Sequence, residues 1–169
     1  MTLFMTMGCA SSNVTTAELD AALAEFDDAS ISDETFKPRD GDWSYTSRQI
    51  LSDSCANAIY MLDLGEGFET DRSGKLFDIT FQNNDSAKCV IGSDKFDCQP
   101  RVETQEYDTK LTLTSTYETR GQMLSQDDME GVHELTISCS GAGCPVLEAT
   151  EGIRFPCRFG GFFTADTRG

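Results

Sequence analysis

A single histidine and many carboxylates limit what this chain can catalyse. His133 is the only histidine in 169 residues, which excludes zinc or iron sites built from several histidines. It lies in an alternating stretch on the same side as Leu135, so we expect it to be buried. No serine or cysteine is placed beside it by a local motif. We therefore expect a structural histidine and no catalysis; a hydrolase that uses His133 as its base is the alternative.

The acidic side chains narrow the range of partners. The chain carries 29 Asp and Glu against 13 Lys and Arg, a net charge of −16, and its pI is about 4.2. Phosphate binding needs clustered cations, so nucleic acid is not expected as a partner. Two acidic clusters, Asp40 with Asp42 and Asp127 with Asp128 and Glu130, offer oxygen ligands to calcium, but neither has the spacing of an EF-hand loop. We expect no metal or cofactor, with calcium as the alternative.

The seven cysteines indicate an oxidising compartment, because no pair has the C-x-x-C spacing of zinc or thioredoxin-like sites. Cys9 ends the run Thr6–Cys9 after Leu3, Phe4 and Met5, and this stretch resembles the end of a bacterial lipoprotein signal. The resemblance implies a lipid on Cys9, a membrane anchor and an extracytoplasmic location in the cell envelope or on the cell surface. A free thiol in an N-terminal tail is the alternative. Without Cys9, six cysteines remain for disulfides.

Residues 10–40 are expected to be an acidic tether with a short helix at about 16–28. Thr15 and Glu18 fit a capping box, and an apolar face follows at Leu19, Ala22, Leu23 and Phe26. We expect this face to dock on the body of the protein; a partner protein of the envelope is the alternative.

From residue 41 the apolar period changes to two, which is typical of strands with one wet face. Alternation is clear at 77–81, 111–117, 135–139 and 153–163, and turn signals separate these stretches at short intervals. The pattern predicts an all-β antiparallel meander of about eight strands, closed or nearly closed into a barrel. A two-sheet sandwich is the alternative, and residues 145–152 leave room for a helical turn or two.

One hairpin permits a residue-level prediction. A two-residue loop at Ser93–Asp94 places Cys89 opposite Cys98, within disulfide range. Cys139 and Cys144 enclose a flexible tetrapeptide and are paired next, which leaves Cys55 and Cys157. If they pair, the end of the strand from Trp43 to Leu51 lies beside the start of the last strand, as closure of an even-stranded meander requires.

The triplet Gly41–Asp42–Trp43, which opens the first strand after a helical segment, resembles the G-x-W motif of the calycins, such as lipocalins and avidins. These are antiparallel barrels that hold small, often apolar ligands, and in lipocalins a basic residue after the last strand packs on the tryptophan. The resemblance implies packing of Arg168 on Trp43 at the barrel base. The corresponding ligand pocket would be lined by Trp43, Tyr45, Phe77, Phe81, Tyr117, His133 and Phe159.

Together these observations predict a signal remnant at 1–9, a tether at 10–40 and a disulfide-stapled barrel at 41–169. The expected function is a non-catalytic envelope lipoprotein whose barrel holds a small apolar ligand. The alternative is a structural or interaction module with a filled core, because the same aromatic residues can serve as ordinary core.

Overall fold

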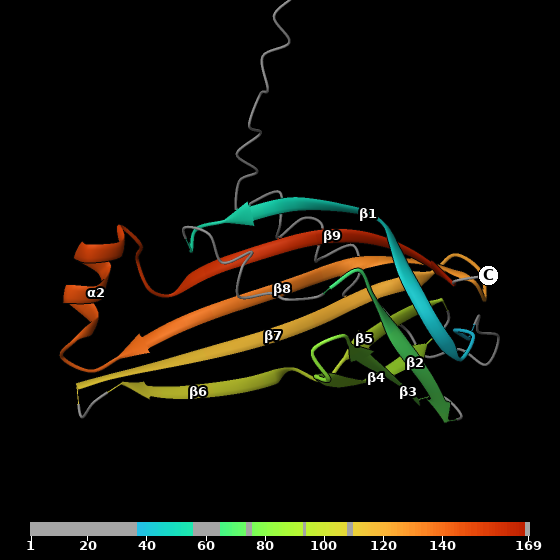
Figure 1. Ribbon diagram of the computed structural model, residues 1–169, viewed down its shortest axis with the longest axis horizontal. Helices are drawn as coiled ribbons and strands as arrows, with labels where there is room; N and C mark the ends of the chain where they lie inside the picture. Colours follow the sequence, from blue (N-terminus) through green and yellow to red (C-terminus); the bar gives the residue numbers. More distant parts are fainter. Residues whose placement is uncertain (1–36, 56–64, 74–75, 93, 108–109, 168–169) are drawn as a thin grey trace, which may run out of the picture.

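The computed structural model describes residues 37–55, 65–73, 76–92, 94–107 and 110–167, which form strands and one short helix (Figure 1). The elements, in chain order, are β1 Gly41–Asp53, β2 Gly67–Ser73, β3 Leu76–Phe81, β4 Ser86–Gly92, β5 Lys95–Cys98, β6 Arg101–Tyr107, β7 Leu111–Met123, β8 Asp128–Ser140, α2 Cys144–Glu151 and β9 Cys157–Thr167.

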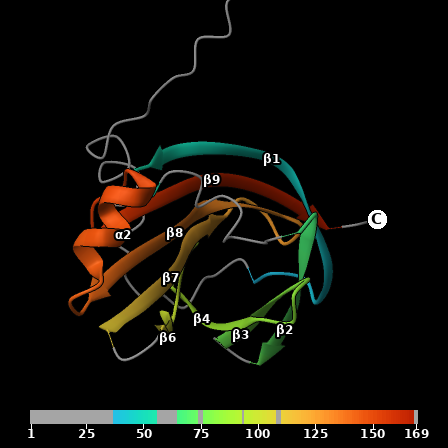
Figure 2. The same ribbon diagram turned by 60° about the vertical axis from the view of Figure 1, so that its left-hand side comes forward.

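The strands close into a barrel of eight strands with one extra strand. Each neighbouring pair is antiparallel, in the order β5-β4-β3-β2-β1-β9-β8-β7, and β5 also pairs with β7 to complete the ring. Figure 2 shows the strands from β7 through β8, β9, β1 and β2 to β3 curving round this ring. The predicted closed meander is thereby confirmed, and the sandwich alternative is wrong. Closure leaves the eight strands without a free edge around the barrel itself.

The extra strand, β6, continues the line of β5 along the same edge of β7. Lys95 lies opposite Gln122 and Arg101 opposite Tyr117, so the register shifts by one residue where Gln99 and Pro100 separate the two strands. Proline has no N–H to give to the ladder and is common at such irregular positions. Strands β1, β7, β8 and β9 are much longer than β2 to β5, and with β6 they run on past the closed part of the barrel as a curved sheet (Figure 1). We call this part the extension.

The buried side chains form two clusters that correspond to these two parts. The larger cluster fills the closed barrel and includes Trp43, Phe77, Phe96 and Phe163. The smaller cluster lies on the inner face of the extension and consists of Cys55, Leu135, Ile137, Cys157 and Phe159. On β8, inward side chains alternate along the strand, so Leu135 and His133 are both buried as predicted.

Three disulfides join the described strands, and each unites the two cysteines expected from the sequence. Cys89 lies opposite Cys98 in the β4–β5 hairpin, in the predicted register. A second bond joins Cys55 after β1 to Cys157 at the start of β9. The third bond joins Cys139 near the end of β8 to Cys144 at the start of α2. Disulfides in this number indicate an extracytoplasmic location.

The predicted start of the last strand is wrong. The last strand begins at Cys157 rather than Ile153, because Pro156 has no N–H for the ladder and the residue before a proline is sterically restricted. Residues 37–40, assigned to the tether, pack on the barrel, where Pro38 is among the most completely buried side chains. Cys9, the expected helix at about 16–28 and Arg168 lie outside the described residues.

Candidate functional site

His133 is a buried polar residue on the inner side of β8. It lies opposite Thr119 on β7 and Gly161 on β9, and its side chain is only 3% exposed. Hydrogen bonds join Nδ1 to the Thr119 hydroxyl at 2.9 Å and Nε2 to the Tyr45 hydroxyl at 3.0 Å. The imidazole stacks on Phe163 with a centroid separation of 4.3 Å. Both ring nitrogens are therefore satisfied by hydroxyl groups.

The surroundings of His133 keep it neutral. Burial, with a smaller contribution from the positive charge of Arg48, lowers the pKa of His133 to about 3. The Arg48 guanidinium lies 5.3 Å from the centre of the Tyr45 ring and donates to the Gly65 carbonyl at 2.8 Å. Burial also raises the pKa of Tyr45, an effect that Arg48 partly offsets. At neutral pH this cluster contains a neutral imidazole, two neutral hydroxyls and one cation.

This geometry does not resemble a general-base site. In a Ser-His-Asp arrangement, one imidazole nitrogen is hydrogen-bonded to a carboxylate and the other to the nucleophile. Here the partners on both sides are hydroxyls, and a base with a pKa of about 3 takes up almost no proton near neutrality. What the arrangement does is tie β1, β7 and β8 together across the barrel interior.

The structure divides the seven predicted pocket residues between the two clusters. Trp43, Phe77 and Phe81 are 0%, 1% and 9% exposed and pack in the closed barrel. Phe159 is buried in the extension, with Tyr117 packed against it. Tyr45 packs against the cluster of the closed barrel, and His133 contacts Phe81 and Phe163 of the same cluster. The predicted pocket residues therefore do not all belong to one cluster.

The base of the barrel is closed by residues that precede β1. Trp43 Nε1 donates to the Arg39 carbonyl at 3.1 Å and to the Thr70 hydroxyl at 3.0 Å, and the Thr70 hydroxyl donates to the same carbonyl at 2.7 Å. The Arg39 side chain forms an ion pair with Asp127 at 2.8 Å. The backbone carbonyl of Arg39 thus satisfies the buried indole N–H.

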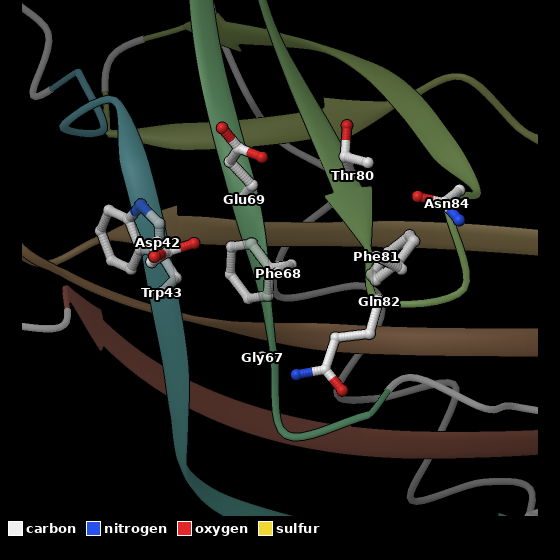
Figure 3. Close-up of a pocket in the computed structure, with 9 residues that line it drawn as sticks. All are labelled: Asp42, Trp43, Gly67, Phe68, Glu69, Thr80, Phe81, Gln82 and Asn84. Carbon is white, nitrogen blue, oxygen red and sulfur yellow. The ribbon is translucent and has the colours of Figure 1, made fainter.

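A shallow hollow of about 200 Å³ lies beside Trp43, where β1, β2 and β3 meet (Figure 3). Sites for drug-sized ligands usually measure about 300–1,000 Å³. Asp42 and Glu69 lie opposite each other at this hollow, and Glu69 lies opposite Thr80. Its lining is completed by Trp43, Gly67, Phe68, Phe81, Gln82 and Asn84. It is a small surface recess with acidic groups along the edge of the barrel core.

One of the two acidic clusters considered for calcium, Asp127 with Asp128 and Glu130, has protein partners. Asp127 binds Arg39 and accepts a hydrogen bond from the Thr167 hydroxyl, and Asp128 accepts one from Ser125 at 2.6 Å. In the ranges that the structure describes, no three His, Cys, Asp or Glu side chains are grouped as a metal ion requires.

Sequence reasoning missed three residues of the central cluster. Thr119 shares strand parity with Tyr117, so alternation placed it inside, but its partnership with His133 depends on the β7–β8 register. Phe163 was expected on an inward face without a partner. Arg48 lies after a register shift in β1, between Tyr45 and Ser47, and this shift removes the simple alternation that would have located it.

Comparisons with models of protein families, with curated proteins and with solved structures found no match to this chain. Among the described residues there is no helix of the length and apolar character needed to cross a bilayer.

Proposed function

We propose that this protein is a non-catalytic, lipid-anchored module of the cell envelope, which acts through its outer surface as a structural or interaction partner. Its barrel is a filled, rigid body rather than a container. The observation that carries the proposal is the packing of the closed barrel.

The interior of the closed barrel is occupied by large side chains from all around the ring. Those of Trp43, Phe77, Phe96, Met123, Met129 and Phe163 are each no more than 2% exposed. Phe77 and Phe96 meet edge to face at 5.4 Å. A Cβ added at Gly121 would lie 2.6 Å from the Phe96 ring, and one at Gly131 would lie 2.8 Å from the Phe163 ring. The Phe96 and Phe163 rings therefore pack directly on two glycines, where a Cβ would also meet a backbone carbonyl oxygen of the neighbouring strand, and this close packing supports a filled interior.

The proposal of a non-catalytic role is supported by the cluster around His133. Its imidazole is buried, neutral and fully hydrogen-bonded to hydroxyls. Its bonds cross-link three strands, which is the role of a buried polar network that specifies one arrangement of a core.

The proposed anchor rests on the signal-like sequence before Cys9 and on the three disulfides among the other cysteines. A charge of −16 would keep such a module solvated and monomeric at the cell surface. Expression of the gene with its upstream region in a bacterial host tests the anchor directly. Mass spectrometry should find diacylglycerol on Cys9, whereas a free Cys9 thiol in the mature protein would refute the anchor.

Titration of the oxidised full-length protein with a fluorescent apolar probe, N-phenyl-1-naphthylamine, tests the filled interior. We expect no saturable fluorescence increase at micromolar protein, and an increase only when denaturant opens the barrel. Saturable binding to the native protein that a long-chain fatty acid competes away would contradict the proposal.

The second candidate is a binder of small apolar molecules on the inner face of the extension. It is favoured by the partial exposure of apolar side chains on that face. Leu111, Leu113 and Tyr117 on β7 are only half-buried. On β1, Ile50 lies opposite Gly161 of β9 and is 45% exposed. If the probe binds, Leu111→Ser should weaken binding about tenfold, since about 1.4 kcal/mol of apolar contact is worth one decade. The neighbouring outward Thr112→Ser serves as the matched control and should leave binding unchanged.

A further inference from the structure

The Cys139–Cys144 disulfide differs from the other two in its surroundings. Cys55, Cys157, Cys89 and Cys98 are all 7% exposed or less. Cys139 and Cys144 are partly exposed and lie at the far end of the extension, away from the closed barrel (Figure 1). The last pair between β8 and β9 is Ile137 with Cys157, so Cys139 lies beyond the point where β9 flanks it.

Of the two elements joined by this disulfide, helix α2 does not pack in the core. Helix α2 has no buried residue and no side-chain cap at its N-terminus, and eight residues form only a marginal helix on their own. The loop between the two cysteines is held separately, because the Gly143 N–H donates to the Lys110 carbonyl at 2.9 Å. A Cβ at Gly141 would lie 2.3 Å from that carbonyl oxygen, so the loop fits closely around it. Opening the disulfide would therefore leave the strands paired and this loop in place.

The two sulfur atoms have unequal surroundings. Cys144 is the first residue of α2, and no acidic residue follows in the first turn to offset the positive end of the helix dipole. A thiolate is favoured at such a position, which makes Cys144 the better leaving group of the pair. Cys139 lies near the end of β8, away from any helix N-terminus.

From this geometry we propose that the Cys139–Cys144 disulfide is a thiol–disulfide exchange site for an external dithiol, while the two buried disulfides stay closed. One thiolate of the dithiol attacks Cys139 Sγ, the Cys139–Cys144 bond breaks, and Cys144 leaves as a thiolate. The second thiol of the dithiol loses its proton and attacks the mixed disulfide, which frees Cys139. The dithiol is oxidised to a disulfide, and the protein gains two thiols with protons from solvent.

The test is limited reduction of the native full-length protein with dithiothreitol, followed by alkylation with N-ethylmaleimide and mass mapping. The matched internal control is Cys89–Cys98, which also closes a short loop, with a sequence separation of 9 residues against 5. We expect Cys139 and Cys144 to be alkylated at least tenfold faster than the other four cysteines, with near-ultraviolet circular dichroism of Trp43 unchanged. Equal rates for the two short-loop disulfides, or faster reduction of Cys89–Cys98, would overturn the proposal.

A second measurement tests which of the two sulfur atoms is attacked, and it does not require the reduced protein to stay folded. Brief exposure of the oxidised protein to glutathione, quenched with acid, should trap the adduct on Cys139. An adduct found mainly on Cys144 would refute the assignment of the leaving group. The single variants Cys139→Ser and Cys144→Ser add a rate comparison: the lone Cys144 thiol should react with iodoacetamide several-fold faster at pH 7 than the lone Cys139 thiol.

Discussion

Mild acid should destabilise this protein through one side chain, His133. Its pKa is about 3 in the folded state against 6.5 for an unperturbed histidine. Between these values the unfolded chain binds a proton that the folded chain does not, so the free energy of unfolding falls as the pH falls from 6.5 toward 3. The slope approaches about 1.4 kcal/mol per pH unit, and the loss between pH 7 and pH 5 is about 2 kcal/mol. Above pH 7 this contribution is complete and constant.

The sequence makes the measurement clean, because His133 is the only histidine and carboxylates titrate mostly below pH 5. Urea unfolding followed by the fluorescence of Trp43, the only tryptophan, should show the loss between pH 7 and pH 5. His133→Gln, which stays neutral, should remove most of it. Equal pH dependence in both proteins would refute the reasoning. So would an imidazole NMR signal that titrates near pH 6.5 in the folded protein.

Two further pairs of variants test the packing and the buried charge. Gly131→Ala should cost about 1–3 kcal/mol in urea unfolding, because its Cβ would lie 2.3 Å from the Arg120 carbonyl oxygen; Gly161→Ala, whose nearest contact is 3.6 Å, should cost much less. Arg158→Met should cost about 3 kcal/mol, because it leaves the 4%-exposed Glu134 side chain without this cation. Arg39→Met breaks an exposed pair and should cost less than about 1 kcal/mol. Equal costs within either pair would contradict the corresponding argument.

The parts of the fold that sequence could predict are those set by local patterns. Two-residue alternation identified the inward side of β3, β7 and β8, and the short turn after Gly92 fixed the β4–β5 register down to Cys89 opposite Cys98. The antiparallel pairing of the first strand with the last followed from the expected closure of an even-stranded meander. These features depend on residues that are close in the chain, so the sequence could predict them.

Local patterns could not predict that the buried side chains form two separate clusters. Alternation indicates that Phe77 and Phe159 both point inward, but it does not say how far along the barrel each one lies. The stagger of long strands past short ones puts Phe77 in the closed barrel and Phe159 in the extension. The bonds from His133 to Tyr45 and Thr119 likewise depend on the registers of three strands, one of which contains bulges. Closure of the base by Pro38 and Arg39 involves irregular chain, for which periodicity gives no signal.

The central claim is that the barrel is filled and carries no small molecule. Native mass spectrometry of the protein extracted from its own cells in mild detergent tests this most directly, because any cargo acquired in the cell is retained. We predict the mass of the disulfide-bonded polypeptide with its covalent anchor and nothing more. A stoichiometric apolar molecule that is lost on denaturation would contradict the claim.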